Sequence, residues 1–442
     1  MCGGAAPTCG ANRTTRRLSK DTRTLVPGDI YLALKGGNFD GNLYVKDAAA
    51  KGAVCAIMDD RELAAQAPED FPVILVEDTL AALHLFAANW RDRLALKVVC
   101  ITGSSGKTST KEFTSAVLGV RYRTIRTEGN LNNHIGLPLS ILSASTSDDA
   151  AVWEIGMNHP GEIAPLAALA RPDLAIVTNI GVAHIEYMGS REAIAAEKAA
   201  LAAAVRPEGA VIVPATDDFA DVIASYTKGR MVYTGGRTGE VAASDVTMQA
   251  SGSTFILHAR GESVLASLPA PGLHMVSNAL LAVAAGLEFG LSLRECAEGL
   301  ASTRMAGGRL SRRDVKGIHF LDDTYNANPD SMEAALATMR ALPCQGRRIA
   351  VLGRMGELGN YAQEGYARVG RAAASAADLL IAVGPETAPL SATARQHGLA
   401  EIRETASPLE AAELLRSLVS AGDTVLVKGS RAARMEAVIQ NF

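Results

Sequence analysis

The chain alternates short apolar runs with longer stretches of helical periodicity. Val98–Ile101, Val152–Ile155 and Leu174–Thr178 are typical of buried strands, and Ala-rich segments around 161–170 and 190–205 separate strand from strand. Strands that alternate with helices in this way indicate a parallel sheet covered by helices. The pattern therefore predicts an α/β protein.

The same pattern divides the 442 residues into three predicted domains. Residues 1–96 form a small α/β domain, with expected strands and helices at Ile30–Leu34, Val45–Lys51, Val54–Met58, Val73–Val76 and Leu80–Leu96. Residues 97–308 form a mostly parallel sheet whose extension, Val232–Leu268, alternates as antiparallel strands do, before a helix at Val276–Phe289. Residues 309–442 are a second α/β unit with strands expected at Ile318–Asp322, Ile349–Gly353, Leu379–Gly384 and Thr424–Gly429. Met305–Leu310 is expected to be a linker. Residues 1–20 show no clear element and are expected to be partly disordered.

A Gly- and Ser-rich turn follows the first strand of the central unit. Its sequence is Thr102-Gly103-Ser104-Ser105-Gly106-Lys107-Thr108, and a segment with few helix breakers comes next. Backbone N–H groups at the start of such a helix bind phosphate, with Lys107 expected at the terminal phosphates and the Thr108 hydroxyl at Mg²⁺. The loop is shorter than the usual G-x-x-x-x-G-K-[ST] pattern, because Ile101 stands where the first Gly belongs. The alternative is a Ser/Gly turn that caps a helix.

Other polar residues stand where ligands collect in parallel sheets, at or beyond the carboxyl ends of strands. Glu154 suits Mg²⁺ but could equally be a solvated carboxylate, and His184 could be structural. Lys198 lies on an Ala-rich segment, where a surface lysine is the ordinary case. The run Asp322–Met332 could hold a ribose or form only a polar loop and helix cap. Lys428-Gly-Ser-Arg431 could bind an anion.

Composition narrows the class of protein. A hydrophobic content of 48% with 20% charged residues suits globular domains with ample cores, and a net charge of −4 gives no electrostatic case for nucleic acid or an anionic membrane. No apolar run approaches the length of a membrane-spanning helix, and the N-terminus lacks the pattern of a signal peptide. The six cysteines form no C-x-x-C pair, which favours a reducing cytoplasm.

Taken together, these stretches resemble the Mur ligases of peptidoglycan synthesis over roughly residues 20–440. The resemblance rests on the segments Ile101–Thr108, Glu128–Pro138, Met157–Ile163, Asp323–Met332 and Val427–Arg431. Tyr325-Asn-Ala-Asn-Pro329 is most similar to the member of the family that adds D-alanyl-D-alanine to UDP-N-acetylmuramoyl-tripeptide (UDP-MurNAc-tripeptide). The resemblance implies a UDP-binding N-terminal domain, a central ATPase domain and a C-terminal Rossmann-like domain. It also implies a monomeric, cytoplasmic, ATP-dependent ligase that makes an amide bond through an acyl phosphate.

The resemblance also implies roles for individual residues. Lys107, His184 and Lys198 are the expected catalytic residues, and Thr108, Glu154, His184 and Lys198 are expected to hold two Mg²⁺ ions, with Lys198 carbamylated. ATP is expected at Gly103, Ser104, Ser105, Gly106, Lys107, Thr108, Asn278, Arg309 and Asp323, with His274 in the segment before the last helix of the central domain. The two other substrates are expected at Thr22, Arg23, Asn38, Asp40, Asn42, Asn130, Asn133, Asn326, Asn328 and Lys428.

Some positions depart from the family pattern. Asn42 stands where His is usual, Arg354 stands where Asp is usual, and no first strand is evident before Asp21. Three alternatives remain open at this point. They are another ligase on the same fold, such as a folylpolyglutamate synthase; a P-loop NTPase that regulates or phosphorylates without forming an amide; and an inactive relative that only binds UDP-sugars.

Overall fold

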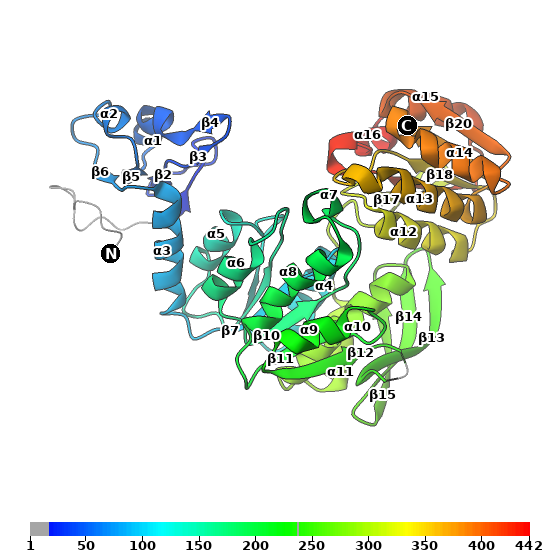
Figure 1. Ribbon diagram of the computed structural model, residues 1–442, viewed down its shortest axis with the longest axis horizontal. Coiled ribbons are helices and arrows are strands. Elements are labelled where there is room, and N and C mark those ends of the chain that lie inside the picture. The colour runs from blue at the N-terminus through cyan, green and yellow to red at the C-terminus, as the bar shows by residue number, and fades with distance from the viewer. Residues whose placement is uncertain (1–16, 237) are drawn as a thin grey trace.

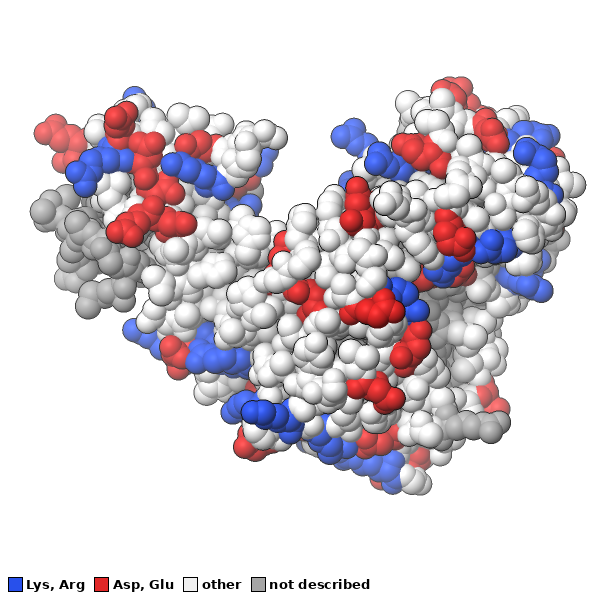
Figure 2. Space-filling view, in the orientation of Figure 1, with Lys and Arg blue, Asp and Glu red and all other residues white. Residues whose placement is uncertain are grey.

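The computed structural model describes residues 17–236 and 238–442 and contains three main sheets, each in its own lobe, and a two-stranded ribbon (Figure 1). We call these the N-terminal lobe (residues 17–96), the central lobe (97–302) and the C-terminal lobe (311–442). The N-terminal and C-terminal lobes stand on opposite sides above the central lobe, and Figure 2 shows a deep hollow between them. Residues 1–16, for which disorder was expected, lie outside the described residues. Within the described residues, no helix is long and apolar enough to cross a bilayer.

The central lobe is built on a nine-stranded sheet with the order β15-β14-β13-β12-β11-β10-β7-β9-β8. Its strands are β7 (Lys97–Thr102), β8 (Thr124–Arg126), β9 (Ala150–Glu154), β10 (Leu174–Val177), β11 (Ala210–Pro214), β12 (Arg230–Thr234), β13 (Val241–Gln249), β14 (Gly252–Ala259) and β15 (Glu262–Leu268). Neighbours are parallel from β8 to β13, and β13, β14 and β15 pair antiparallel. The carboxyl ends of β7, β9 and β10 therefore lie side by side at one edge of the sheet.

Helices cover both faces of this sheet, because alternate residues of its buried strands point to opposite sides. On one face, Val99 and Ile101 pack in a core with α4 (Lys107–Gly119), α10 (Leu273–Glu288) and α11 (Leu293–Ala301). On the other face, Val98 and Cys100 pack in a core with α5 (Gly136–Leu142), α6 (Ile163–Ala170), α8 (Arg191–Ala203) and α9 (Ala220–Tyr226). A short helix, α7 (Ile185–Met188), follows β10.

The C-terminal lobe has a six-stranded sheet with the order β16-β17-β21-β18-β19-β20. Its strands are β16 (Ser311–Val315), β17 (Ile318–Asp323), β18 (Arg348–Leu352), β19 (Leu379–Val383), β20 (Glu401–Thr405) and β21 (Thr424–Lys428), and β16 alone pairs antiparallel. One face packs on α12 (Pro329–Ala341), α13 (Ala362–Ala376) and α14 (Ala388–Gln396), and the other on α15 (Pro408–Leu418) and α16 (Glu436–Gln440).

The N-terminal lobe is small and is attached through one long helix. Its parallel sheet, β1-β2-β5-β6, consists of β1 (Leu18–Ser19), β2 (Ile30–Leu32), β5 (Cys55–Met58) and β6 (Val73–Leu75), beside a two-stranded ribbon, β3 (Lys35–Gly36) and β4 (Phe39–Asp40). Two short helices, α1 (Val45–Ala50) and α2 (Arg61–Ala64), precede the long helix α3 (Thr79–Arg91). The Trp90 indole donates to the Ala144 carbonyl at 2.9 Å and the Arg91 guanidinium to the Ala170 carbonyl at 2.9 Å, so α3 is anchored to the central lobe.

The predicted α/β architecture, with its antiparallel extension of a mostly parallel sheet, is confirmed. Three details of the prediction were wrong. The antiparallel extension begins at β13, because β12 pairs parallel with β11. Helix α3 ends at Arg91 and not at Leu96, although Leu94 and Leu96 stay buried and so continue the apolar pattern. A strand does precede Asp21: it is the two-residue β1.

Candidate active site

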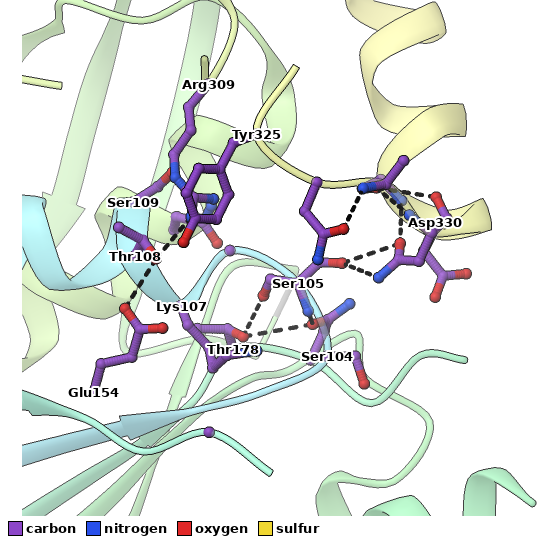
Figure 3. Close-up of a pocket in the computed structure, with 18 of the residues that line it drawn as sticks. Ser104, Ser105, Lys107, Thr108, Ser109, Glu154, Thr178, Arg309, Tyr325 and Asp330 are labelled. Carbon is purple, nitrogen blue, oxygen red and sulfur yellow. Dashed lines mark hydrogen bonds between the residues drawn. The ribbon is translucent and has the colours of Figure 1, made fainter. Parts of the chain in front are cut away.

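A cavity of about 520 Å³ lies where the central and C-terminal lobes meet. Residues from the carboxyl ends of β7, β9 and β10 line it on one side, and the last residues of β17 and β21 with the segment after β17 line it on the other (Figure 3). It contains most of the predicted site residues of these two lobes, namely Ser104, Ser105, Gly106, Lys107, Thr108, Asn130, Asn133, Glu154, His184, Asn278, Arg309, Asp323, Asn326, Asn328 and Lys428. The cavity lining is therefore polar and is contributed by both lobes.

The loop between β7 and α4 requires glycine at two positions. Gly103 and Gly106 have φ angles of 146° and 81°, and Gly106 is the N-cap of α4. A Cβ on Gly106 would lie 2.6 Å from the Asn278 Oδ1 atom, and one on Gly103 would collide with the Thr178 hydroxyl. Any side chain at Gly103 or Gly106 would therefore collide with Thr178 or Asn278, and both φ angles favour glycine.

The strand end after β10 holds this loop in place. The Ser105 N–H donates to the Asn179 side-chain oxygen at 2.8 Å, and the Thr178 hydroxyl donates to the Ser105 carbonyl at 2.5 Å. The Ser104 N–H donates to the Asn179 carbonyl at 3.0 Å. Because these bonds fix the loop, its helix-initiating N–H groups are already arranged for an anion.

Glu154 ends β9 and is almost fully buried. Its carboxylate accepts hydrogen bonds from the Thr108 hydroxyl at 2.9 Å and from the Asn132 amide at 2.8 Å. Arg309, in the linker between the lobes, donates to the Thr108 hydroxyl at 2.9 Å and lies over the Tyr325 ring, 4.3 Å from its centroid (Figure 3). Two oxygens suited to a hard cation therefore lie next to a cationic side chain suited to phosphate.

Two lysines lie in desolvated surroundings near the loop. The Lys107 ammonium donates to the Gly103 carbonyl at 2.7 Å, and burial lowers its pKa. Lys198, on α8, is only 1% exposed and does not line the cavity. Burial lowers the pKa of Lys198 well below its usual value, and the charge of Lys107 lowers it further. Among the described residues, none bonds the Lys198 amine, and its burial disfavours the charged form.

His184 lies at the cavity wall just before α7 and has a φ angle of 62°. Its Nδ1 atom pairs with the carboxylate of Glu357, which comes from the C-terminal lobe. This contact lowers the pKa of Glu357. The His184 side chain thus contacts the lobe opposite its own.

The last residues of β17 and β21, with the segment that follows β17, complete the other wall. The Lys428 ammonium pairs with the Asp323 carboxylate at 2.5 Å and donates to the Asn326 carbonyl at 2.9 Å. Asn328 caps α12 and its amide donates to the Ser105 hydroxyl at 3.0 Å, which links the C-terminal lobe to the loop between β7 and α4. His274 also lines the cavity, and burial lowers its pKa to about 4, so it is neutral near pH 7.

The predicted residues of the N-terminal lobe lie apart from this cavity. Arg23 and Asn38 are exposed, and the Arg23 guanidinium pairs with Asp21 at 2.7 Å, which lowers the pKa of Asp21 to about 2. Asn42 is fully buried, and its amide donates to the Asp40 carboxylate at 2.8 Å and to a second carboxylate in the same lobe. Thr22, Arg23, Asn38, Asp40 and Asn42 are all absent from the cavity lining. The Asn42 side chain therefore supports its own turn, and substrate binding by this lobe stays a prediction.

Several cavity residues carried no predicted role. Asn132 bonds Glu154, whereas the predicted Asn133 side chain accepts from the N–H of Gly136, the first residue of α5, at 2.9 Å. Tyr325 faces Arg309, and Asp330 accepts from the Val182 N–H at 2.9 Å. All three belong to the segments that carry the resemblance, but an Asn run alone does not indicate which amide points into the site.

The fold and this cavity define a class of protein. A helix-initiating glycine loop, a buried carboxylate beside its hydroxyl and a second α/β lobe that completes the site are features of nucleotide-dependent enzymes of the P-loop type. Family models then match the three lobes in turn. They are the Mur ligase family catalytic domain at residues 16–91, the Mur ligase middle domain at 101–286 and the Mur ligase glutamate ligase domain at 308–431. The chain belongs to the Mur ligase family, as its motifs predict.

Individual relatives resemble the chain over nearly its whole length. A UDP-N-acetylmuramoyl-tripeptide–D-alanyl-D-alanine ligase of Bacillus subtilis (strain 168) is 34% identical, and the match covers 96% of this chain and 92% of the relative. A crystal structure of MurF from Acinetobacter baumannii has a TM-score of 0.87 at 34% identity, covering 96% of this chain and 92% of the other. MurF ligase from Thermotoga maritima in complex with ADP has a TM-score of 0.86 at 27% identity, covering 98% of each chain.

Proposed function

We propose that this chain is an ATP-dependent ligase that joins D-alanyl-D-alanine to UDP-MurNAc-tripeptide. The observation that carries the proposal is the polar cavity between the central and C-terminal lobes, in a chain that relatives with that name match over 96% of its length. The reaction forms an amide and converts ATP to ADP and phosphate. The proposed setting is the cytoplasm, where the precursor and ATP are available, and the proposed active form is a monomer.

The side chains and backbone groups that line the cavity are chemically suited to a magnesium nucleotide. The loop from Gly103 to Thr108 offers N–H donors at a helix start, and Lys107 and Arg309 bring two positive charges. Within the described residues, no three acidic, His or Cys side chains cluster as a metal site, and Glu154 with the Thr108 hydroxyl provides only two oxygens. That number suits Mg²⁺, which usually takes one or two carboxylates and completes its shell with phosphate oxygens and water.

The proposed chemistry has two steps. A carboxylate is a poor electrophile, so a tripeptide carboxylate oxygen first attacks the γ-phosphorus of ATP, and ADP leaves. The amine of D-alanyl-D-alanine then attacks the acyl carbon of the resulting acyl phosphate, and phosphate leaves with the carboxylate oxygen. Lys107 and Arg309 face the charge that develops on the migrating phosphoryl group. When bound, Mg²⁺ neutralises phosphate charge and orients the oxygens.

The site residues beyond the phosphate-binding loop have proposed roles as well. Asn278, which touches Gly106, and Asp323 would contact the nucleotide, whereas Asn130, Asn326 and Lys428 would contact the peptide substrates. His184 and Lys198 would hold the second Mg²⁺. The unpartnered and desolvated Lys198 amine supports carbamylation, because a neutral amine can attack CO₂ and gain a carboxylate end.

The N-terminal lobe is proposed to hold the UDP end of the long precursor. The ribbon β3–β4, which bears Asn38 and Asp40, faces the hollow between the lobes (Figures 1 and 2). A precursor bound there would extend its peptide across this hollow to the cavity. Approach of the N-terminal lobe would then shield the acyl phosphate from water.

The test is phosphate release by the purified protein, with one component omitted at a time. Release is expected only with ATP, Mg²⁺, UDP-MurNAc-tripeptide and D-alanyl-D-alanine together, with one pentapeptide formed for each phosphate. Turnover of nucleotide without peptide substrates would identify a P-loop NTPase of another purpose. Activity with a folate and glutamate would identify a folylpolyglutamate synthase, and binding of UDP-sugars without turnover an inactive relative.

A further inference from the structure

Two residues with unusual backbone angles meet across the boundary between the central and C-terminal lobes. His184 has a φ angle of 62° and Glu357 one of 59°, and they are two of the eight non-glycine residues with positive φ in the described part of the chain. Such angles are unfavourable for residues other than glycine and persist where the surroundings enforce them, often at functional sites. The pair therefore marks a position where both loops are held in a particular shape.

The contact involves both side chain and backbone. The Glu357 carboxylate pairs with Nδ1 of His184, and the Glu357 carbonyl accepts the Glu186 N–H at 3.2 Å. Gly359 packs so closely that a Cβ there would lie 3.0 Å from the Glu186 side chain. Within residues 17–236 and 238–442, Glu357 is the only polar side chain that pairs with the His184 ring, and the buried Nδ1 atom has no hydrogen bond of regular geometry. The orientation of this ring thus depends on a loop of the other lobe.

We propose that Glu357 is a positioning residue for the ligase reaction. Its carboxylate accepts the Nδ1 proton of His184 and fixes the ring, so that Nε2 is the nitrogen left for the cavity. The His184 side of the active site is then complete only while the C-terminal lobe is docked. A carboxylate that orients a histidine in this way is the usual support of a metal-binding imidazole. The inference rests on the proposed function, and it adds a reason why docking of the lobe and catalysis are coupled.

Other contacts keep the lobe docked when this one is removed. Asn328 bonds Ser105, Asp330 bonds the Val182 N–H, and Arg309 bonds Thr108. Substitution of Glu357 is therefore expected to release the His184 ring and leave the arrangement of the two lobes unchanged. That separation distinguishes a positioning role from a purely structural one.

The experiment compares Glu357→Ala and Glu357→Gln with Glu364→Ala and Glu364→Gln. Glu364 is a matched control, because it is an exposed glutamate of the same lobe whose only ion pair among the described residues is with Arg371. The first measurement needs no metal or substrate. This measurement is the ¹⁵N spectrum of protein labelled at histidine, in which the His184 signals are assigned by their loss in His184→Asn. Small-angle scattering of the same samples reports the arrangement of the lobes. The second is the Mg²⁺ concentration for half-maximal phosphate release, measured beside the KM for ATP.

In the unmodified protein, His184 is expected as a single tautomer with its proton on Nδ1. Glu357→Ala should average the two tautomers and raise the Mg²⁺ requirement about 10- to 100-fold, the range for loss of such a support. The KM for ATP and the scattering curve should stay unchanged. Glu357→Gln should recover part of the effect, because its amide oxygen can accept the same proton, and the Glu364 variants should match the parent.

A fixed His184 tautomer in Glu357→Ala, or a Mg²⁺ requirement within twofold of the parent, would overturn the inference. Loss of the docked arrangement in Glu357→Ala would also overturn it, because Glu357 would then act on the whole lobe. Failure of the parent protein to form pentapeptide would refute the proposed function instead. The tautomer measurement in the metal-free protein distinguishes the two failures.

Discussion

Replacement of Lys198 by methionine should separate stability from activity. Methionine has a similar length and no charge, and Lys198 is 1% exposed on α8 with no bonding partner among the described residues. An unpartnered buried polar group costs roughly 1–3 kcal/mol. The unfolding free energy of metal-free Lys198→Met is therefore expected to exceed that of the parent by about this amount at high pH.

The pH dependence of this gain follows from the lowered pKa of Lys198. Below pH 10.5 the unfolded chain binds a proton that the folded chain does not, so the parent loses stability as the pH falls from 10.5 toward the folded pKa. The advantage of Lys198→Met should therefore be larger at pH 7 than at pH 10. Urea unfolding in the presence of a chelator measures it, with the exposed Lys228→Met as control.

Ligase activity should move in the opposite direction. Phosphate release that depends on both peptide substrates should fall about 100-fold or more in Lys198→Met, the scale for losing one group that stabilises transition-state charge. A ¹³C signal of a carbamate formed from labelled bicarbonate should appear in the parent and be absent from the variant. The reasoning would be refuted by a variant that is less stable than the parent by more than about 1 kcal/mol, or by one that keeps its activity.

Three further substitutions test the cavity. Gly106→Ala should weaken ADP binding more than about tenfold in calorimetry, because its Cβ would lie 2.6 Å from Asn278 and its φ is 81°; unchanged affinity would contradict the assigned loop. Arg309→Ala should lower kcat about 10²-fold and leave the fold intact by circular dichroism, and an unchanged kcat would exclude a role at the phosphates. The parent should lose up to about 3 kcal/mol of unfolding free energy as the pH falls from 6.5 to about 4, because only the unfolded His274 is protonated there. His274→Gln should not show this loss. Equal loss in both proteins by urea unfolding would show that His274 titrates normally.

Local sequence sufficed for features that are built from neighbouring residues. The loop from Gly103 to Gly106 occupies consecutive positions between a buried strand and a helix, so its place in the fold was predictable, whereas its role in phosphate binding stays a prediction. The apolar runs likewise indicated the central strands, because a strand buried on both faces is apolar throughout. The direction of β12 was not predictable, since an alternating pattern shows which face is buried but not which way the neighbouring strand runs.

Contacts between the lobes could not be predicted from the sequence. The pairing of His184 with Glu357, and of Asp330 with the Val182 N–H, depends on how two separately folded units meet. The end of α3 was missed for a related reason. Leu94 and Leu96 remain buried after the helix has ended, so the apolar pattern continued where the hydrogen-bonded helix did not.

The most direct test of the central claim follows one oxygen atom. UDP-MurNAc-tripeptide labelled with ¹⁸O in the carboxylate that forms the new bond is incubated with the protein, ATP, Mg²⁺ and D-alanyl-D-alanine. If the carboxylate is activated as an acyl phosphate, each phosphate released should contain one ¹⁸O atom, in step with pentapeptide formation. Unlabelled phosphate, or phosphate formed without pentapeptide, would contradict the account.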